Sequence, residues 1–165
     1  MKRIEDEIRQ EKFTSVHQKA VVNLIYTSNW VQNKQQEFFK TFGITGQQFN
    51  ILRILKGQFP KSISGTEIKN RMLDRNSDVS RLLNRLAAKK LITKHTCPND
   101  KRASDVNITE DGIALLNQVS KTQNQDYVLS LSDEEADLLS NLLDKARNNQ
   151  QEVNPVLSSQ SPSAR

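Results

Sequence analysis

The chain has 165 residues, of which 35% are hydrophobic and 26% are charged, and its formal net charge is +5. This composition is typical of a soluble globular protein with enough chain for a real core, and we expect one domain. No apolar run approaches the roughly 18 residues of a membrane span, and the first residues lack the apolar segment of a secretory signal. The single cysteine, Cys97, excludes an intramolecular disulfide and favours a reducing, cytoplasmic compartment.

Positive charge is concentrated in the middle of the chain. Residues 1–60 hold nine Lys or Arg against five Asp or Glu, residues 61–102 hold eleven against four, and residues 103–165 hold four against ten. The three net charges are therefore +4, +7 and −6. A basic segment attracts phosphate and releases counterions, which is the usual source of non-specific DNA affinity. The acidic last third argues against a protein that merely coats polyanions.

Helices are expected in the first 43 residues. A long helix over residues 13–31 is predicted by the helical spacing of Phe13, Val16, Ala20, Val21, Leu24 and Val31. Ile4 and Ile8 have the spacing that would extend this helix back to residue 4. A second, short helix is expected to include Phe38, Phe39 and Phe42 and to end at Gly43.

The next helix begins at a capping box, Thr45-x-x-Gln48, in which two side chains satisfy free backbone groups of the first turn. Its inward side chains are predicted to be Phe49, Leu52, Leu55 and Phe59, and Pro60 stops it. The residues that follow, 61–63, are placed to pair with a later hairpin as a short third strand.

Residues 64–90 predict two helices joined by a short turn. Ser64-x-x-Glu67 is a second capping box, and Ile68, Met72 and Leu73 are expected to form the buried face of the first helix. Residues 74–76 turn the chain, and Asn76 is a suitable N-cap for the second helix, over residues 76–90. This order is the helix-turn-helix layout.

The second of these helices has two contrasting faces. Val79, Leu82, Leu83 and Leu86 form one apolar stripe. The opposite face carries Ser77, Arg81, Asn84 and Ala88, with Ser80 and Arg85 on the flanks. A helix with such a face can lie in the DNA major groove, where Ser, Asn and Arg read base edges. The alternative is an ordinary amphipathic surface helix.

A β-hairpin is expected directly after this helix. Residues 91–96 read as a strand, residues 97–102 as a polar turn, and residues 104–108 as the return strand. Lys101 and Arg102 make the tip basic. The order predicts a winged helix-turn-helix, mainly α with a small β-hairpin wing, although a purely structural ribbon with a solvated tip is the alternative reading.

These residues also resemble the multiple antibiotic resistance regulator (MarR) family. Asp100-x-Arg102 followed by Val106-x-Ile108-Thr109-x-x-Gly112 looks like that family's wing-to-helix signature. Residues 79–86 and 89–92 are similar to its recognition-helix segment, and the resemblance covers roughly residues 13–148. Lys90 departs from the pattern, because the family commonly has Gly there, and a Lys makes the helix end less sharply defined.

Two more helices follow the wing. Thr109 is predicted to cap a helix carrying Ile113, Leu116, Val119 and Tyr127. Ser132-x-x-Glu135 is a third capping box, and it opens a helix with an apolar stripe of Leu139, Leu142, Leu143 and Ala146. The predicted organisation is N-terminal helices (1–43), a winged helix-turn-helix (44–112), C-terminal helices (113–150) and a disordered tail (151–165) rich in Ser, Pro and Gln.

Candidate DNA contacts follow from this organisation. Major-groove contacts are predicted for Ser77, Ser80, Arg81 and Asn84, with Arg81 the best candidate for guanine. Arg102 is predicted to contact the minor groove or its phosphates, and Lys101, Arg75, Lys69 and Lys61 are phosphate candidates whose alternative is plain surface charge. The resemblance implies that Asp100 positions Arg102 through an ion pair.

The terminal helices flank the winged helix, so they suggest a dimer interface, or else they only complete a monomer core. The resemblance implies a two-fold homodimer, and such a dimer would bind half-sites about one helical turn apart in a near-palindromic operator. The resemblance also implies a repressor that responds to a small aromatic compound bound between the dimer helices and the DNA-binding lobe. Trp30, Phe38, Phe39 and Phe42 could line such a cleft, but core packing explains them equally well.

Catalytic and metal chemistry is not expected. His17 and His95 lack partners at metal-ligand spacing, and no catalytic motif or phosphate loop is present, so no cofactor is predicted. A redox role for Cys97 has little support. The second functional hypothesis is a winged helix used as a protein-interaction module, which would have little DNA affinity.

Overall fold

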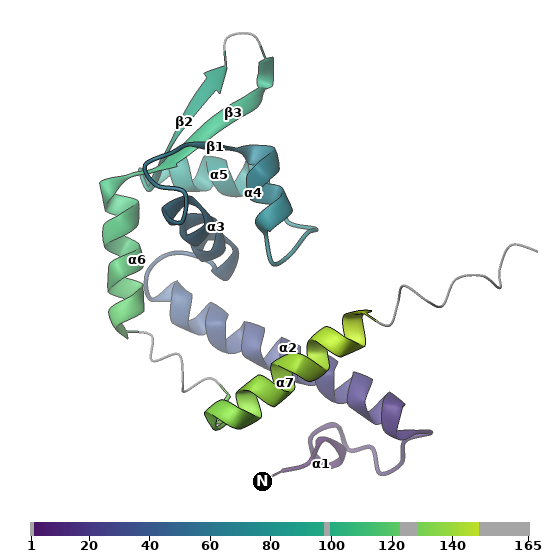
Figure 1. Cartoon of the computed structure of the whole chain (residues 1–165). Helices are drawn as coiled ribbons and strands as arrows, with labels where there is room; N and C mark the ends of the chain where they lie inside the picture. Colours follow the sequence, from purple (N-terminus) through teal and green to yellow (C-terminus); the bar gives the residue numbers. More distant parts are fainter. Residues whose placement is uncertain (1, 98–99, 123–128, 149–165) are drawn as a thin grey trace, which may run out of the picture. The chain divides into compact units, whose positions relative to one another are not determined.

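The computed structural model describes residues 2–97, 100–122 and 129–148, apart from the side chains of residues 96–104 (Figure 1). The chain divides into two compact units, residues 1–124 and 125–165, which are described separately. The elements of the first unit are α1 (Ile4–Ile8), α2 (Val16–Lys40), α3 (Gly46–Lys56), β1 (Ile63–Ser64), α4 (Gly65–Arg71), α5 (Val79–Ala88), β2 (Ile92–Cys97), β3 (Asp100–Ile108) and α6 (Glu110–Thr122). The second unit contains α7 (Asp133–Asn148).

A small antiparallel sheet with strand order β1-β3-β2 lies beside the helices of the first unit (Figure 1). Ile63 pairs with Val106 and Ile92 pairs with Ile108. The predicted third strand is therefore present, but it comprises residues 63–64 and not 61–63. The hairpin of β2 and β3 extends away from the helices, as expected for a wing (Figure 1). The predicted fold class, mainly α with a small β wing, is therefore confirmed.

The core joins the helices to the sheet. Its most deeply buried side chains are Ile51, Leu52, Leu55, Ile68, Leu86, Val106 and Val119, which come from α3, α4, α5, β3 and α6. Burial of each such aliphatic side chain stabilises the fold by about 1.5–3 kcal/mol. Lys56 of α3 adds a polar contact at the surface, because its Nζ donates to Asn117 Oδ1 of α6 at 2.9 Å.

Two capping boxes of the first unit differ in how completely they form. In α3, Thr45 accepts from the backbone of Gln48 while the Gln48 side chain accepts from the Thr45 amide, so this box is confirmed. In α4, Ser64 Oγ accepts from the Glu67 amide at 3.1 Å. The Glu67 carboxylate pairs with Arg71 at 2.6 Å instead of reaching back to the cap.

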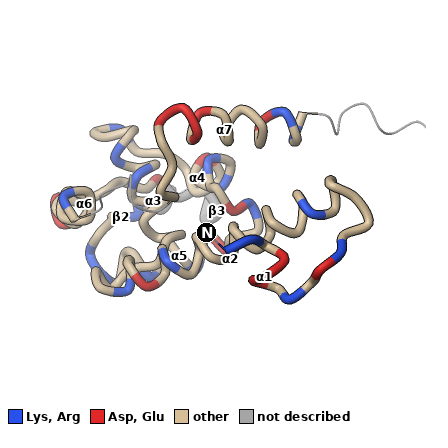
Figure 2. The backbone as a smooth tube through the Cα atoms, turned by 90° about the horizontal axis from the view of Figure 1, so that it is seen from below, with Lys and Arg blue, Asp and Glu red and all other residues tan. Residues whose placement is uncertain are grey.

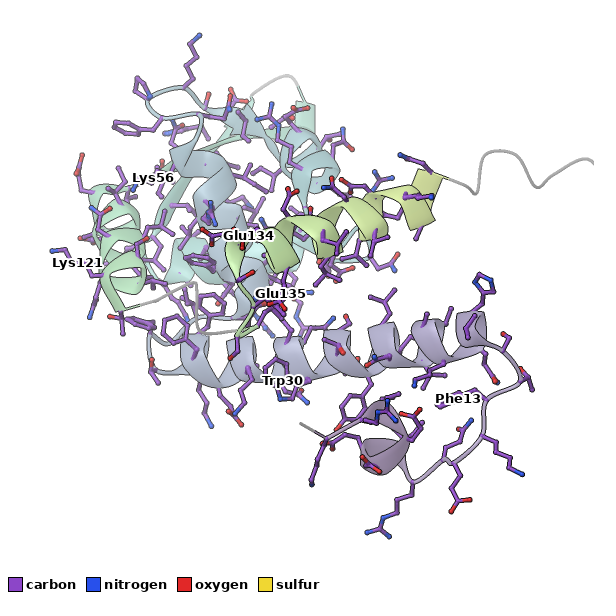
Figure 3. All side chains as sticks on the ribbon, turned by 60° about the horizontal axis from the view of Figure 1, so that its bottom comes forward. Phe13, Trp30, Lys56, Lys121, Glu134 and Glu135 are labelled. Atoms are coloured by element: carbon purple, nitrogen blue, oxygen red, sulfur yellow. The ribbon has the colours of Figure 1, made fainter. Side chains whose placement is uncertain are left out.

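The predicted extension of the first helix to residue 4 is wrong. Helix α1 ends at Ile8, because Arg9 takes a left-handed conformation with φ of 53°. Helix α2 starts anew at Val16, where Ser15 Oγ accepts from the Gln18 amide. Phe13 lies in the segment between the two helices (Figure 3). Periodicity alone could not reveal this interruption, since Ile4 and Ile8 keep helical spacing.

The separate short helix predicted around Phe38, Phe39 and Phe42 is also wrong. Helix α2 continues to Lys40, so Phe38 and Phe39 lie in its last turn and Phe42 follows it. The intervening residues 32–37 are mostly Gln, Lys and Glu, which are good helix formers, and nothing among them breaks the helix. Gly43, with φ of 67°, reverses the chain after it.

Three expectations about individual residues fail because helices end earlier or begin later than predicted. Phe59 is 51% exposed, because α3 ends at Lys56 with Gly57 as its C-cap. Leu73 is 90% exposed, because α4 ends at Arg71 and only Met72 turns inward. Helix α5 starts at Val79 with Asp78 as its N-cap, so Asn76 lies in the turn and is not the cap.

The C-terminal end of α5 is sharply defined despite the Lys at its boundary. Lys90 adopts φ of 59°. The Lys90 amide donates to the Ala87 carbonyl at 2.9 Å, and the Leu91 amide donates to the Leu86 carbonyl at 3.1 Å. This bond pattern is a Schellman motif, in which a left-handed residue closes the helix. Thr109 caps α6 as predicted, because its Oγ1 accepts from the Gly112 amide at 3.1 Å.

The second unit is described through α7. The third capping box is confirmed, since the Ser132 amide donates to the Glu135 carboxylate at 2.9 Å and Ser132 Oγ accepts from the Glu135 amide at 3.3 Å. No residue of α7 is buried, and its exposed apolar side chains include Leu138, Leu139 and Leu142. Tyr127 and the predicted tail lie outside the described residues. Among the described helices, none has the length and apolar character needed to cross a membrane.

Candidate nucleic-acid interface

Helix α5 presents a polar face to solvent because its apolar stripe is buried as predicted. Val79, Leu82, Leu83 and Leu86 are all in the core. Asp78 caps the helix by accepting from the Arg81 amide at 3.0 Å. The exposed side chains on the outer face are Ser80, Arg81, Asn84, Arg85 and Ala88. They supply hydroxyl, guanidinium and amide groups of the kinds that read base edges.

Ser77 is not on this face, contrary to the prediction. It precedes the first turn of α5 and is only 7% exposed. Its hydroxyl donates to Asp74 Oδ2 at 2.9 Å and accepts from Gln47 Nε2 at 3.1 Å. The reason is the late start of the helix: the spacing argument placed residue 77 inside a regular helix, whereas the backbone there still belongs to the turn.

Asn84 contacts the root of the wing. Lys94 Nζ of β2 donates to Asn84 Oδ1 at 2.7 Å. A lysine ammonium only donates, so the carbonyl oxygen of the Asn84 amide is the atom that faces it. The amide NH₂ of Asn84 is therefore the group left to donate outward.

The predicted phosphate contacts come from several elements of the helix-turn-helix. Lys69 is exposed on α4, Arg75 is exposed in the turn before α5, and Lys61 is exposed just before β1. Figure 2 shows the Lys and Arg positions along this part of the backbone. Lys101 and Arg102 lie on strand β3 of the wing.

Predictions about side chains at the wing tip fall outside the described part of the chain. These concern Lys101, Arg102, Cys97 and the Asp100–Arg102 ion pair. Only the backbone of this region is described, and it shows a register irregularity between Thr96 and Cys97. The roles proposed for these four residues remain predictions.

Helix α3 contributes two side chains that the sequence reasoning missed. Gln47 Nε2 donates to Asp74 Oδ2 at 3.0 Å as well as to Ser77. Asn50 Oδ1 accepts from the Leu73 amide at 3.0 Å. Gln47 and Asn50 are three residues apart, so they share one face of α3. That spacing was the signal available in the sequence, but their partners lie 23 to 30 residues away.

Asp74 has an altered acidity. Hydrogen bonds from the Asn76 amide, the Ser77 hydroxyl and the Gln47 amide lower the pKa of this carboxyl below its ordinary value of 3.8. Each donor stabilises the ionised form in preference to the protonated form. The turn before α5 is thus organised around a carboxylate.

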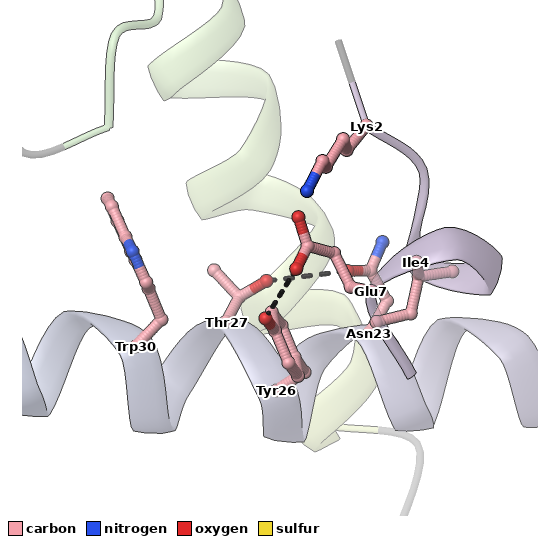
Figure 4. Close-up of a pocket in the computed structure, with 7 residues that line it drawn as sticks. All are labelled: Lys2, Ile4, Glu7, Asn23, Tyr26, Thr27 and Trp30. Atoms are coloured by element: carbon pink, nitrogen blue, oxygen red, sulfur yellow. Dashed lines mark hydrogen bonds between the residues drawn. The ribbon is translucent and has the colours of Figure 1, made fainter. Parts of the chain in front are cut away.

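Of the aromatic residues predicted to line an effector cleft, the three phenylalanines contact one another, whereas Trp30 lies apart from them. Phe38 contacts Phe39 and Phe42 with ring centroids 5.3 and 5.2 Å apart, and Phe38 and Phe42 are packed against the core. Trp30 of α2 instead lines a pocket of about 300 Å³ (Figure 4). The other residues lining it are Lys2, Ile4, Glu7, Asn23, Tyr26 and Thr27. Tyr26 Oη donates to the Glu7 carboxylate at 2.9 Å.

Comparison with known proteins gives consistent matches. The family model described as MarR family matches residues 42–103. The transcriptional regulator PecS of Dickeya dadantii is 28% identical over 100 residues, which cover 59% of this chain and 60% of PecS. The chain thus spans about three fifths of this curated relative.

Solved structures match more of the chain. A MarR transcription factor from Planctomyces limnophilus is 27% identical with a TM-score of 0.63, covering 83% of this chain and 99% of that one. A mutant of MarR from Escherichia coli, complexed with operator DNA, is 23% identical with a TM-score of 0.65, covering 88% of this chain and 99% of that one.

The helix pair α4–α5, followed by the β2–β3 hairpin, defines a winged helix-turn-helix protein. The sequence resemblance at residues 79–112 and the matches to the family model and to solved structures agree. The winged helix-turn-helix of this chain, residues 42–103, is similar to that of the MarR family of transcriptional regulators.

Proposed function

We propose that this protein binds double-stranded DNA in a sequence-specific manner and represses transcription. The observation that carries the proposal is the outer face of α5, where Ser80, Arg81 and Asn84 are exposed while the opposite stripe is buried. This face belongs to a segment, residues 61–102, whose net charge is +7. Such a combination supports phosphate attraction together with base reading.

Base reading and backbone contacts are assigned to different residues. Arg81 is the candidate for a bidentate contact with guanine, since its guanidinium is exposed near the middle of α5. Lys69 lies on α4, and the first helix of a helix-turn-helix crosses the DNA backbone. Lys69 is therefore assigned to phosphate, as are Lys61, Arg75 and Lys101.

The experiment is selection of preferred duplexes from a random pool at near-physiological salt, followed by binding measurements with two variants. Arg81→Ala is expected to lose discrimination between the selected and unrelated duplexes by about 1–3 kcal/mol. Lys69→Ala is expected to weaken binding to both duplexes equally and to reduce the salt slope by about one. Selection of no motif by the unmodified protein would favour the protein-interaction alternative.

We further propose that the protein acts as a homodimer on a near-palindromic operator. Exposed apolar side chains occur on α2, including Val21, Leu24 and Ile25, and on α7, including Leu139 and Leu142. Apolar surface of this kind commonly marks a protein interface. A two-fold dimer presents two copies of α5, so half-sites about one helical turn apart would be expected.

Oligomeric state can be tested with a charge placed on α7. Leu142→Asp is expected to shift the protein toward monomer in analytical ultracentrifugation, because a carboxylate cannot be buried in an apolar interface without a large free-energy cost. Ser140→Asp is the matched control, since it adds the same charge about 200° away around the helix. Equal sedimentation of both variants as dimers would contradict an interface through this face of α7.

The proposed repressor is ligand-responsive, and the pocket beside Trp30 offers a way to test this. Trp30 is the only tryptophan of the chain and is 41% exposed. Titration with small aromatic acids such as benzoate is expected to change its fluorescence and to weaken binding to the selected duplex. A fluorescence change without any effect on DNA binding would argue against regulation through this pocket.

A further inference from the structure

We propose that Gln47, Asp74 and Ser77 form a positioning triad that holds the start of helix α5 in the orientation needed to read DNA. The proposal rests on the DNA-binding function proposed above and assigns residues that make no base contact themselves. It explains why a buried serine, a turn aspartate and a glutamine from another helix are joined in one hydrogen-bond network.

The three side chains form a closed ring of hydrogen bonds. Gln47 Nε2 donates to Asp74 Oδ2 at 3.0 Å and to Ser77 Oγ at 3.1 Å, while Ser77 Oγ donates to Asp74 Oδ2 at 2.9 Å. A glutamine NH₂ carries two hydrogens and a serine hydroxyl one, so all three bonds can exist together. Two of them end on an ionised carboxylate, which makes them stronger than neutral bonds.

The ring connects α3 to the turn that precedes α5. The second carboxylate oxygen of Asp74 accepts from the Asn76 amide at 2.9 Å, which fixes the backbone of the turn. Val79, the first residue of α5, donates its amide to the Ser77 carbonyl at 3.0 Å. The path from α3 to the first turn of α5 is therefore continuous: Gln47, then Asp74 and Ser77, then Val79.

Helix α3 is a suitable anchor because its apolar side is in the centre of the core. Ile51, Leu52 and Leu55 are completely or almost completely buried. Asn50 reinforces the attachment by accepting from the Leu73 amide at 3.0 Å, at the other end of the turn. Bonds at both ends limit how the turn can move relative to α3, and hence how α5 is presented.

A variant of Gln47 can distinguish a loss of helix positioning from a loss of overall stability, because Gln47 is exposed at the surface of α3. Gln47→Ala removes both bonds to the turn and leaves the core and the helix propensity of α3 intact. We expect the Gln47→Ala variant to bind the selected duplex about tenfold more weakly than the unmodified protein does. Its affinity for an unrelated duplex should fall by less than about twofold, and the salt dependence of its binding should stay the same. Gln118→Ala, an exposed glutamine change on α6, is the matched control and should bind as the unmodified protein does.

A conservative exchange tests the donor role. Gln47→Glu keeps the size of the side chain but replaces the NH₂ donor with an acceptor facing the Asp74 carboxylate. Binding to the selected duplex should fall at least as far as in Gln47→Ala. Binding by Gln47→Glu at the level of the unmodified protein would overturn the proposal, because it would show that the donor is not needed.

A second measurement without DNA tests the triad even if the unmodified protein selects no DNA motif. The NMR signal of the Asn76 amide should follow the ionisation of Asp74, to which it donates. In Gln47→Ala this titration should move to higher pH, and amides of residues 73–77 should exchange faster, while those of the α5 core should not. Failure to select DNA would thus reject the proposed function alone, whereas an unchanged titration and exchange would reject the triad.

Discussion

Gly112 in α6 lies against the carbonyl oxygen of Leu91, and the approach leaves no room for a side chain. A Cβ atom at residue 112 would lie 2.3 Å from the Leu91 oxygen and 2.7 Å from Ile108 Cγ1. The Leu91 carbonyl cannot move away freely, because it accepts from the Thr109 amide at 3.1 Å. Thr109 also donates from its Oγ1 to the Lys90 carbonyl at 2.8 Å. The close packing of α6 against the end of α5 therefore explains the glycine of the Thr109-x-x-Gly112 motif.

Gly112→Ala is expected to destabilise the protein by on the order of 3 kcal/mol, because backbone must shift to relieve the overlap. Urea unfolding followed by circular dichroism measures this change. Gly57→Ala is the matched control: its nearest contact would be an ordinary 3.5 Å to the Ile54 carbonyl, and its φ is −65°. Equal stability of the two variants would show that the Leu91 carbonyl can move away from residue 112 at little cost in free energy.

Lys90→Gly is expected to stabilise the protein by about 1 kcal/mol. Lys90 occupies the left-handed position of the Schellman motif with φ of 59°, a conformation that costs a residue with a Cβ about 1–2 kcal/mol. The greater freedom of glycine in the unfolded chain offsets part of the gain.

The neighbouring Lys89→Gly variant is the control, because Lys89 has φ of −85° and needs no glycine. Thermal unfolding of both variants should give opposite shifts in Tm. A decrease in the Tm of Lys90→Gly would show that Lys90 is not strained in its left-handed conformation.

Lys94→Met is expected to change the base that is preferred opposite Asn84. Its overall affinity for DNA should fall no further than in a variant that loses another single lysine, such as Lys69→Ala. With Lys94 on one lone pair of its carbonyl oxygen, Asn84 presents its NH₂ group outward, which suits acceptors such as guanine O6 or thymine O4. Removing the lysine frees the carbonyl and permits the bidentate contact with adenine. Duplex selection with the variant measures the shift, and Lys94→Arg, which restores a donor, should retain the original preference.

Loss of the Asp74 charge should remove a component of acid sensitivity. The pKa of Asp74 is lowered in the folded protein by the Asn76, Ser77 and Gln47 donors, so its contribution to stability is present above the ordinary value of 3.8. That contribution disappears as the pH falls from about this value through the lowered pKa.

Unfolding free energies measured between pH 6 and pH 2.5 should therefore fall less steeply below pH 4 for Asp74→Asn than for the unmodified protein. Ser77→Ala, which removes one of the donors, should give an intermediate slope. Identical slopes in all three proteins would contradict the role of these bonds.

The sequence by itself determined the helix-turn-helix, the wing and the buried face of α5, although it misplaced the breaks around α1 and α2. Val79, Leu82, Leu83 and Leu86 repeat at helical spacing, and capping residues such as Thr45 and Ser132 act within one turn, so short-range rules were sufficient. The wing and its third strand followed from alternation and order. The MarR-like motif at residues 100–112 pointed to the family before any tertiary contact was known.

Only the tertiary structure decided where the turn before α5 ends and what holds it. Ser77 fits helical spacing but is buried by a hydrogen-bond network with Asp74 and Gln47, and its partner on α3 is 30 residues away. The orientation of Asn84 depends in the same way on Lys94 of the wing. Side-chain hydrogen bonds between distant segments leave no periodic trace in a sequence, because each depends on a single pair of atoms that folding brings within about 3 Å.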